Sequence, residues 1–264
     1  MFIVELILKR AEMAIVLDSL GLSTLIGMET DAFQMSDHEK RALASSGASG
    51  LIDRNLAERG DDGTLAIDGD LRAIVKVAAD AELAVVILKD IPGLGKQLIV
   101  HAAMNNAVVE HTRPTGDSHR VAVLKAQTDL PERWAEILPL GDEPRNGRIN
   151  SNLEIFPKIV SLANAGAFAD AIRLFPGGTP RALADQLVKD MHSPTYSANI
   201  AFLWREQGLI TDGRNLMLLV GENASWLIAQ IQPGSPIIEI NKVNREVCLL
   251  EMVEQWKSVA QHSS

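Results

Sequence analysis

Four short apolar segments joined by very short turns constrain the fold of this chain more than any other feature. They are rich in Val, Ile and Leu, as β-strands are, and they lie at residues 83–88, 97–102, 107–111 and 119–124. The turns between them carry glycine, proline and asparagine, for example Pro92-Gly93 and Asn105-Asn106. Parallel strands need a crossover of about a dozen residues or more. The segments therefore predict an antiparallel sheet.

The same order of elements returns in the second part of the chain. Helical segments come first, and four apolar segments follow at residues 197–205, 216–220, 225–231 and 237–240, with a turn expected at 211–213. Each set of strands is followed by one amphipathic helix, around residues 130–138 and from Asn244 onward. The pattern predicts an α+β fold of two related halves in a quasi-two-fold arrangement, each with helices, a four-stranded antiparallel sheet and a closing helix. An internal duplication explains this order, although hairpins followed by a helix are also common in unrelated α+β proteins.

A polar stretch separates the two halves. Residues 141–151 (GDEPRNGRINS) contain glycine, proline and asparagine, which is typical of a linker. We expect an N-terminal α+β half at residues 1–140 and a C-terminal α+β half at residues 152–264. A chain of 264 residues with 47% hydrophobic residues can form one large domain or two small ones with a sizeable core.

Local patterns place several helix boundaries. Ser36 begins an S-x-x-E capping pattern, and we expect a helix there with a break near Gly47 and Gly50. A strand at residues 64–68 and a helix at residues 70–79 follow, which gives this half a winged-helix-like segment. The spacing in the closing helix predicts one buried stripe, made of Val247, Leu250, Val253 and Trp256.

Charge and composition argue against several classes of function. The chain has 25 basic and 34 acidic residues and a net charge of −9, which disfavours nucleic acids and anionic membrane surfaces as partners. No stretch reaches the apolar length of a transmembrane helix, and Lys9-Arg10 follow the first apolar run instead of preceding it, unlike a signal peptide. We therefore expect a cytoplasmic protein. The single cysteine, Cys248, excludes an intrachain disulfide.

No motif points to catalysis. The segment 92–97 (PGLGKQ) lacks the first glycine and the final hydroxyl of a phosphate-binding loop. His101, His111 and His119 lie on three consecutive predicted strands, where they could face one another and bind zinc. The segment offers no paired aspartate or cysteine ligands, however, and histidines are common on half-exposed sheets. We predict no catalytic residue, no metal and no cofactor.

The arrangement resembles the EspG-type chaperones of type VII (ESX) secretion systems. Members of that family open with an "LG" segment, continue with a long helix, and close each set of strands with a helix of regularly spaced leucines. The matching residues here are Leu20-Gly21, Leu51 to Gly60, Asp70-Leu71 with Ile74, and Leu130 with Ile137-Leu138. The resemblance covers nearly the whole chain, although the family's proline after "LG" is absent.

The resemblance implies a mixed α/β fold with a quasi-two-fold relation between its halves and a non-enzymatic cytosolic chaperone. Such proteins bind a helical secretion substrate, a heterodimer of PE–PPE type, keep it soluble and pass it to the export machinery. A homodimer of the chaperone is left open.

Candidate contact residues lie in the first hairpin turn and on two later strands. The turn offers Ile91 and Leu94 as apolar side chains, with Lys96 beside them. Tryptophan is enriched at interface hot spots, so Trp204 and Trp226 are further candidates, although a core position is the simpler explanation for both. We expect these five residues to bind the partner.

Two other functions stay open at this point. A winged-helix transcriptional regulator, or another interaction module, fits residues 51–68, but Arg54 and Arg59 alternate there with acidic Asp53 and Glu58, a poor face for phosphates. An enzyme would need a site assembled from distant residues, for which the best candidates are His101, His111, Asp117 and His119.

Overall fold

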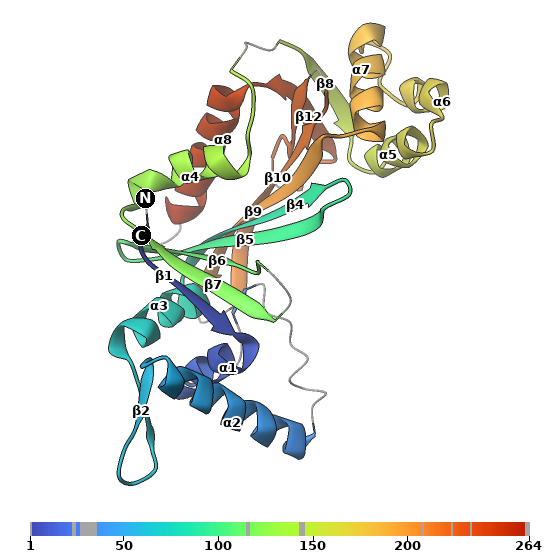
Figure 1. Ribbon diagram of the computed structural model, residues 1–264. Helices are drawn as coiled ribbons and strands as arrows, with labels where there is room; N and C mark the ends of the chain where they lie inside the picture. Colours follow the sequence, from blue (N-terminus) through green and yellow to red (C-terminus); the bar gives the residue numbers. More distant parts are fainter. Residues whose placement is uncertain are drawn as a thin grey trace. The chain divides into compact units, whose positions relative to one another are not determined.

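The computed structural model describes residues 2–22, 25–26, 36–114, 117–142, 146–206, 209–222, 224–232 and 234–261 (Figure 1). Its helices are α1 (Arg10–Ser19), α2 (Asp37–Asp53), α3 (Gly69–Asp80), α4 (Leu130–Ile137), α5 (Phe156–Asn164), α6 (Phe168–Arg173), α7 (Arg181–His192) and α8 (Arg245–Ala260). Its strands are β1 (Phe2–Lys9), β2 (Ala57–Arg59), β3 (Leu65–Ile67), β4 (Leu83–Ile91), β5 (Gly95–Met104), β6 (Ala107–Thr112), β7 (Ser118–Leu124), β8 (Arg148–Asn152), β9 (Tyr196–Glu206), β10 (Leu209–Val220), β11 (Ser225–Gln230) and β12 (Ile237–Val243).

Ten of these strands form one hydrogen-bonded order, β1-β7-β6-β5-β4-β9-β10-β11-β12-β8, and β2 pairs with β3 in a separate hairpin. The pairs with a defined register, such as β5 with β6 and β11 with β12, are antiparallel. The predicted α+β fold with antiparallel strands is therefore confirmed, and the strands expected as a four-stranded sheet in each half belong to one order of ten. Its physical cause is the one read from the sequence, since turns this short cannot connect parallel strands.

The chain divides into two compact units, and each is built from separate segments. The first comprises Met1–Val85, Leu98–Leu130 and Leu203–Thr211, and the second comprises Val86–Gln97, Pro131–Phe202 and Asp212–Ser264. The end of the expected linker is not a loop, because β8 pairs there with β12. The boundaries expected at residues 140 and 152 stay a prediction.

The first unit packs α1 against α2 at two glycines. A Cβ atom at Gly47 would lie 2.2 Å from the backbone oxygen of Ala11, and one at Gly50 would lie 2.6 Å from Oε1 of Glu12. The expected break in the helix at these glycines is wrong, since α2 continues through both. The two glycines allow α1 and α2 to approach each other closely, which a larger side chain at either position would prevent. The capping box of Ser36 and Glu39 is present as expected.

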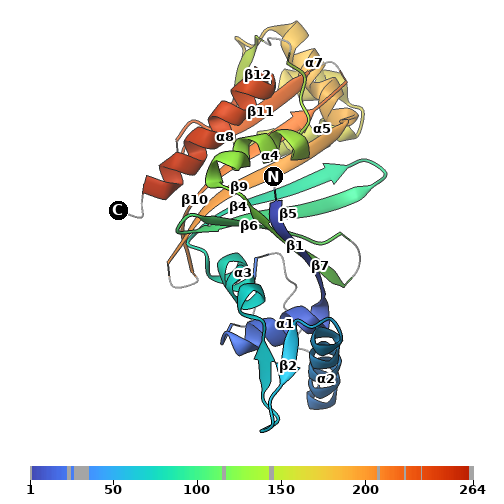
Figure 2. The same ribbon diagram turned by 60° about the vertical axis from the view of Figure 1, so that its left-hand side comes forward.

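The core of the second unit lies between α5, α6, α7 and the strands β8, β10, β11 and β12. Figure 2 shows α5 and α7 on the same side of β11 and β12. Ile159, Leu187, Trp226 and Ile240 are fully buried there. Ile240 alternates with polar Glu239 and Asn241 along β12, so that one face of this strand meets the helices. On β11 the buried residues Trp226, Leu227 and Ile228 follow one another, so both faces of that strand are covered.

The order of elements repeats along the chain. One strand, β1 or β8, comes first, and helices, a run of four strands and a closing helix follow in both parts. Each opening strand pairs with the last strand of its own run, β1 with β7 and β8 with β12. The internal duplication itself stays a prediction.

Two local expectations are wrong. The turn expected at residues 211–213 lies inside β10. The polar residues there suggested the end of a strand, but the strand runs through them from Leu209 to Val220. The stripe predicted for α8 is displaced around the helix: Cys248, Met252 and Val259 are buried, whereas Val247 and Leu250 are 50% and 59% exposed. Apolar residues occupy more than one side of this helix, so their spacing did not identify the side that faces the core.

Candidate partner-binding surface

The turn between β4 and β5 has the conformation that its residues require. The amide of Leu94 donates a hydrogen bond to the carbonyl oxygen of Ile91 at 3.0 Å, and Gly93 has a φ of +79°. Proline followed by a glycine with positive φ is the composition of a type II turn. Gly95 also has a positive φ, +84°. The chain therefore reverses direction at two glycines and displays the one large side chain between them.

That side chain is Leu94, which is 78% exposed. Lys96 is exposed next to it, and Ile91 is half-buried at the end of β4. A single exposed leucine is common on protein surfaces, but here a tight turn holds it outward. The turn residues are thus available to a partner, and all three belong to the second compact unit.

Trp226 lies in the core of the second unit. Its side chain is fully buried, and its indole Nε1 donates a hydrogen bond to Oδ2 of Asp190 on α7 at 2.8 Å. The ammonium of Lys242 lies 5.2 Å from the centre of its ring. A Cβ atom at Gly221 would lie 2.0 Å from Oδ1 of Asp190, so the chain approaches this carboxylate closely. In this structure Trp226 acts through packing and offers a partner no surface.

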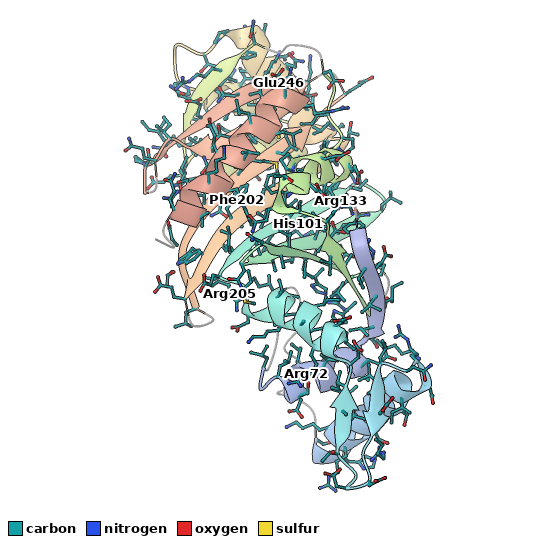
Figure 3. The ribbon with its side chains drawn as sticks, turned by 90° about the vertical axis from the view of Figure 1, so that its left-hand side faces the viewer. Arg72, His101, Arg133, Phe202, Arg205 and Glu246 are labelled. Carbon is teal, nitrogen blue, oxygen red and sulfur yellow. The ribbon has the colours of Figure 1, made fainter. Side chains whose placement is uncertain are left out.

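Trp204 is also largely buried, at 7% exposure, and belongs to the first unit. Its indole Nε1 donates to Oε1 of Glu206 at 3.3 Å. The other two tryptophans lie in the second unit, where Trp134 meets Trp256 and Phe202 edge to face at ring distances of 6.3 and 6.2 Å. Phe202 is one of the side chains labelled in Figure 3.

Sequence reasoning missed several exposed apolar residues. In the first unit, Leu209 and Ile210 at the start of β10 are 72% and 62% exposed. In the second unit, four half-exposed residues gather at one end of β8, β11 and β12, namely Leu153, Ile155, Ile231 and Ile237. Two backbone hydrogen bonds hold this group together, from Leu153 to Pro236 and from Ile231 to Ile237. Only strand pairing brings these positions together, and pairing is not visible in local sequence.

The three strand histidines do not converge on one point. His101 (labelled in Figure 3) is fully buried, and its Nε2 lies 3.1 Å from Oε2 of Glu110, its neighbour across the strand pair. Since successive residues of a strand point to opposite faces, His111 lies on the other face from Glu110. The zinc arrangement considered above is therefore not formed. Arg120 continues the network, donating to Glu110 at 2.6 Å and to Glu5 at 2.8 Å.

His111 and His119 form a stacked pair inside the first unit. Nε2 of His111 lies 3.0 Å from Nδ1 of His119, and the rings are 5.2 Å apart and nearly parallel. Nδ1 of His111 also lies 3.2 Å from the carbonyl oxygen of Ile26, which only an N–H can approach favourably. His111 is then neutral, with His119 donating to its Nε2. Burial, followed by the nearby His119, lowers the pKa of His111 to about 4.

The winged-helix-like segment lacks a cationic face for DNA. The guanidinium of Arg54, one of its two candidate arginines, donates to Oε2 of buried Glu12 at 2.8 Å. Arg59 is exposed at the end of β2, directly after exposed Glu58. Phosphate binding needs several clustered cations, and no other observation favours the regulator hypothesis.

Two features are absent from the described part of the chain. Nowhere in these ranges do three His, Cys, Asp or Glu side chains gather closely enough to hold a metal ion. Among the helices that the structure describes, none is long and apolar enough to span a membrane.

Comparison with known proteins places the fold beside that of a solved structure. No family model and no curated protein matches the chain. A solved structure does match: the type VII secretion system chaperone EspG5 of Mycobacterium tuberculosis, in complex with a PE25–PPE41 dimer. The match covers 97% of this chain and 96% of that chain, with a TM-score of 0.68 and 13% sequence identity. The resemblance to EspG-type chaperones is thus confirmed at the level of the fold.

Proposed function

We propose that this protein is a non-enzymatic, cytoplasmic chaperone or adaptor that binds a helical client protein. The observation that carries the proposal is the fold, which matches that of EspG5 over nearly the full length of both chains. EspG5 was solved bound to a PE25–PPE41 dimer, and a client of this PE–PPE type is the partner we propose here.

The turn between β4 and β5 is the proposed contact with the client. Pro92 and the hydrogen bond from Leu94 to Ile91 already restrict this turn, so little conformational freedom is lost when a partner buries the leucine. Its burial removes apolar surface from water, which contributes about 1.5–3 kcal/mol for a full leucine side chain. We assign the contact to Ile91, Leu94 and Lys96, while Trp204 and Trp226 support the fold from inside.

The proposal is tested by titrating a purified PE–PPE heterodimer into the wild-type chain and into the double variant Ile91→Ala, Leu94→Ala. We expect the variant to bind about thirtyfold more weakly, which corresponds to about 2 kcal/mol. Calorimetry gives the affinity, and thermal unfolding shows whether the variant is folded. Leu209→Asp is the matched control, because it changes an equally exposed leucine on another hairpin. Unchanged affinity of the double variant would remove the turn from the site, and a wild-type chain that binds no such heterodimer would refute the client.

A further inference from the structure

The strand β8 ends the order of the ten-stranded sheet and has one neighbour, β12. Figure 1 shows it beside β12, with α5 and α7 close to it in the same unit. No other strand in the described part of the chain pairs with its far side. An edge strand of this kind presents backbone groups that another extended segment can pair with.

The backbone groups on that side belong to Arg148 and Asn150. The amide of Lys242 donates to the carbonyl oxygen of Gly147, and the amide of Leu153 donates to that of Pro236. In an antiparallel pair, residues alternate between facing the partner strand and facing away from it. Residues 147, 149, 151 and 153 therefore face β12, and the N–H and C=O groups of Arg148 and Asn150 point away.

A hollow of about 350 Å³ lies along this edge. Arg148, Ile149 and Asn150 form one wall, and the turn at residues 176–180 (PGGTP) forms the other. A second hollow of about 430 Å³ lies on the other side of the same turn and shares Pro176 and Thr179 with the first. The space beside the strand is large enough for the side chains of an extended segment.

Basic residues line both hollows. Their linings contain Arg148, Arg173 and Arg181 and no acidic residue, in a chain whose net charge is −9. Arg148 pairs with Glu239 and Arg173 pairs with Asp170. The pair on Arg173 is largely exposed, and exposed pairs contribute little stability. The guanidinium group of Arg173 is thus available to a carboxylate brought by a partner, and Arg181 lines the same hollow.

We propose that the edge of β8 binds an extended, carboxylate-bearing segment of the client as an added strand. The segment pairs with the backbone of Arg148 and Asn150, places an apolar side chain beside Pro176 and Pro180, and brings its carboxylates to the arginines. Such strand addition draws affinity from main-chain hydrogen bonds and specificity from alternate side chains. The inference rests on the proposed function, since the segment belongs to the same client.

The test uses a fluorescent ten-residue peptide in which aspartate alternates with valine, titrated into the full chain and followed by anisotropy. Asn150→Pro removes an N–H that points away from β12, so the sheet keeps its own pairing. We expect this variant to bind the peptide about tenfold more weakly than wild type, while the matched control Asn150→Ala stays within about twofold. A peptide with lysine in place of aspartate should bind more weakly than the aspartate peptide.

A second pair of variants keeps the test decisive if Asn150→Pro fails to unfold cooperatively. Arg181→Glu should weaken binding of the peptide. Lys158→Glu should leave binding unchanged, because Lys158 is exposed on α5 and does not line either hollow. Equal binding by Arg181→Glu and wild type, or no binding of the peptide by wild type, overturns the inference. Titration with the PE–PPE heterodimer separates the two proposals. If the heterodimer binds wild type and Asn150→Pro equally well, the proposed function stands and the β8 site falls.

Discussion

At the scale of single residues, the His111–His119 pair is the feature with the clearest consequence. The two rings share one hydrogen bond of 3.0 Å, and His111 is 1% exposed. A proton added to Nε2 of His111 would face the N–H of His119 and would lose hydration. The folded protein therefore keeps His111 neutral at pH values where the unfolded chain already binds a proton.

This predicts a loss of stability in mild acid. The pKa of His111 falls from its ordinary value of 6.5 to about 4 in the folded state. Between these two pH values the unfolded chain binds a proton at His111 and the folded protein does not. The free energy of unfolding is therefore unaffected by this group well above pH 6.5, and it decreases as the pH falls from 6.5 toward 4. We expect a loss of about 3 kcal/mol over this range, measured by urea unfolding at several pH values.

A variant identifies the source of that loss. In His111→Asn the free energy of unfolding should change less steeply with pH between 6.5 and 4, although the variant is less stable than wild type at neutral pH. The matched control is His38→Asn, because His38 is exposed at the start of α2 and its replacement should leave the dependence unchanged. If the free energy of unfolding changes equally steeply with pH in wild type and in His111→Asn, the His111–His119 pair does not control stability in acid.

At the scale of elements, the packing of α1 on α2 depends on Gly47. Alanine normally stabilises a helix by about 1 kcal/mol relative to glycine. Here the new Cβ would stand 2.2 Å from the oxygen of Ala11, so the helices would have to separate. The close approach and the helix propensity thus predict effects of opposite sign.

We expect the close approach to dominate, so that Gly47→Ala lowers the free energy of unfolding by about 1–3 kcal/mol. Chemical denaturation measures the change. Ser46→Ala is the control on the same helix, because Ser46 is exposed and the substitution should be neutral or slightly stabilising. A more stable Gly47→Ala protein would show that the two helices have room to adjust.

At the scale of the whole molecule, the two compact units do not follow the order of the chain. The first unit includes Leu203–Thr211 from the second half, and the second includes Val86–Gln97 from the first half. A cut within residues 141–151 would therefore remove segments from both units. The strand β8 would also be lost from a fragment that begins at residue 152.

We expect the fragments 1–140 and 152–264, each expressed alone, to lack the cooperative thermal unfolding of the full chain. Each would expose apolar surface that the missing segments cover in the intact unit. Circular dichroism against temperature is the measurement. The full chain is the control, and a fragment with a sharp transition of its own would establish the predicted boundary as a true domain boundary.

The sequence by itself determined the α+β class, the antiparallel strands and the β4–β5 turn. These features depend on local physics: short connections exclude parallel pairing, and Pro92-Gly93 favours its turn wherever it occurs. The capping box at Ser36 is equally local. The sequence also showed the absence of known catalytic motifs and the resemblance that the fold comparison later confirmed.

Only the tertiary structure decided which residues are inside and which strands meet. β8 is polar apart from Ile149 and becomes a strand because β12 pairs with it. The side of α8 that faces the core, and the burial of Trp226 against Asp190, likewise depend on partners distant in the chain. Contacts of this kind join residues that are far apart in sequence, so no local pattern of spacing or composition could have predicted them.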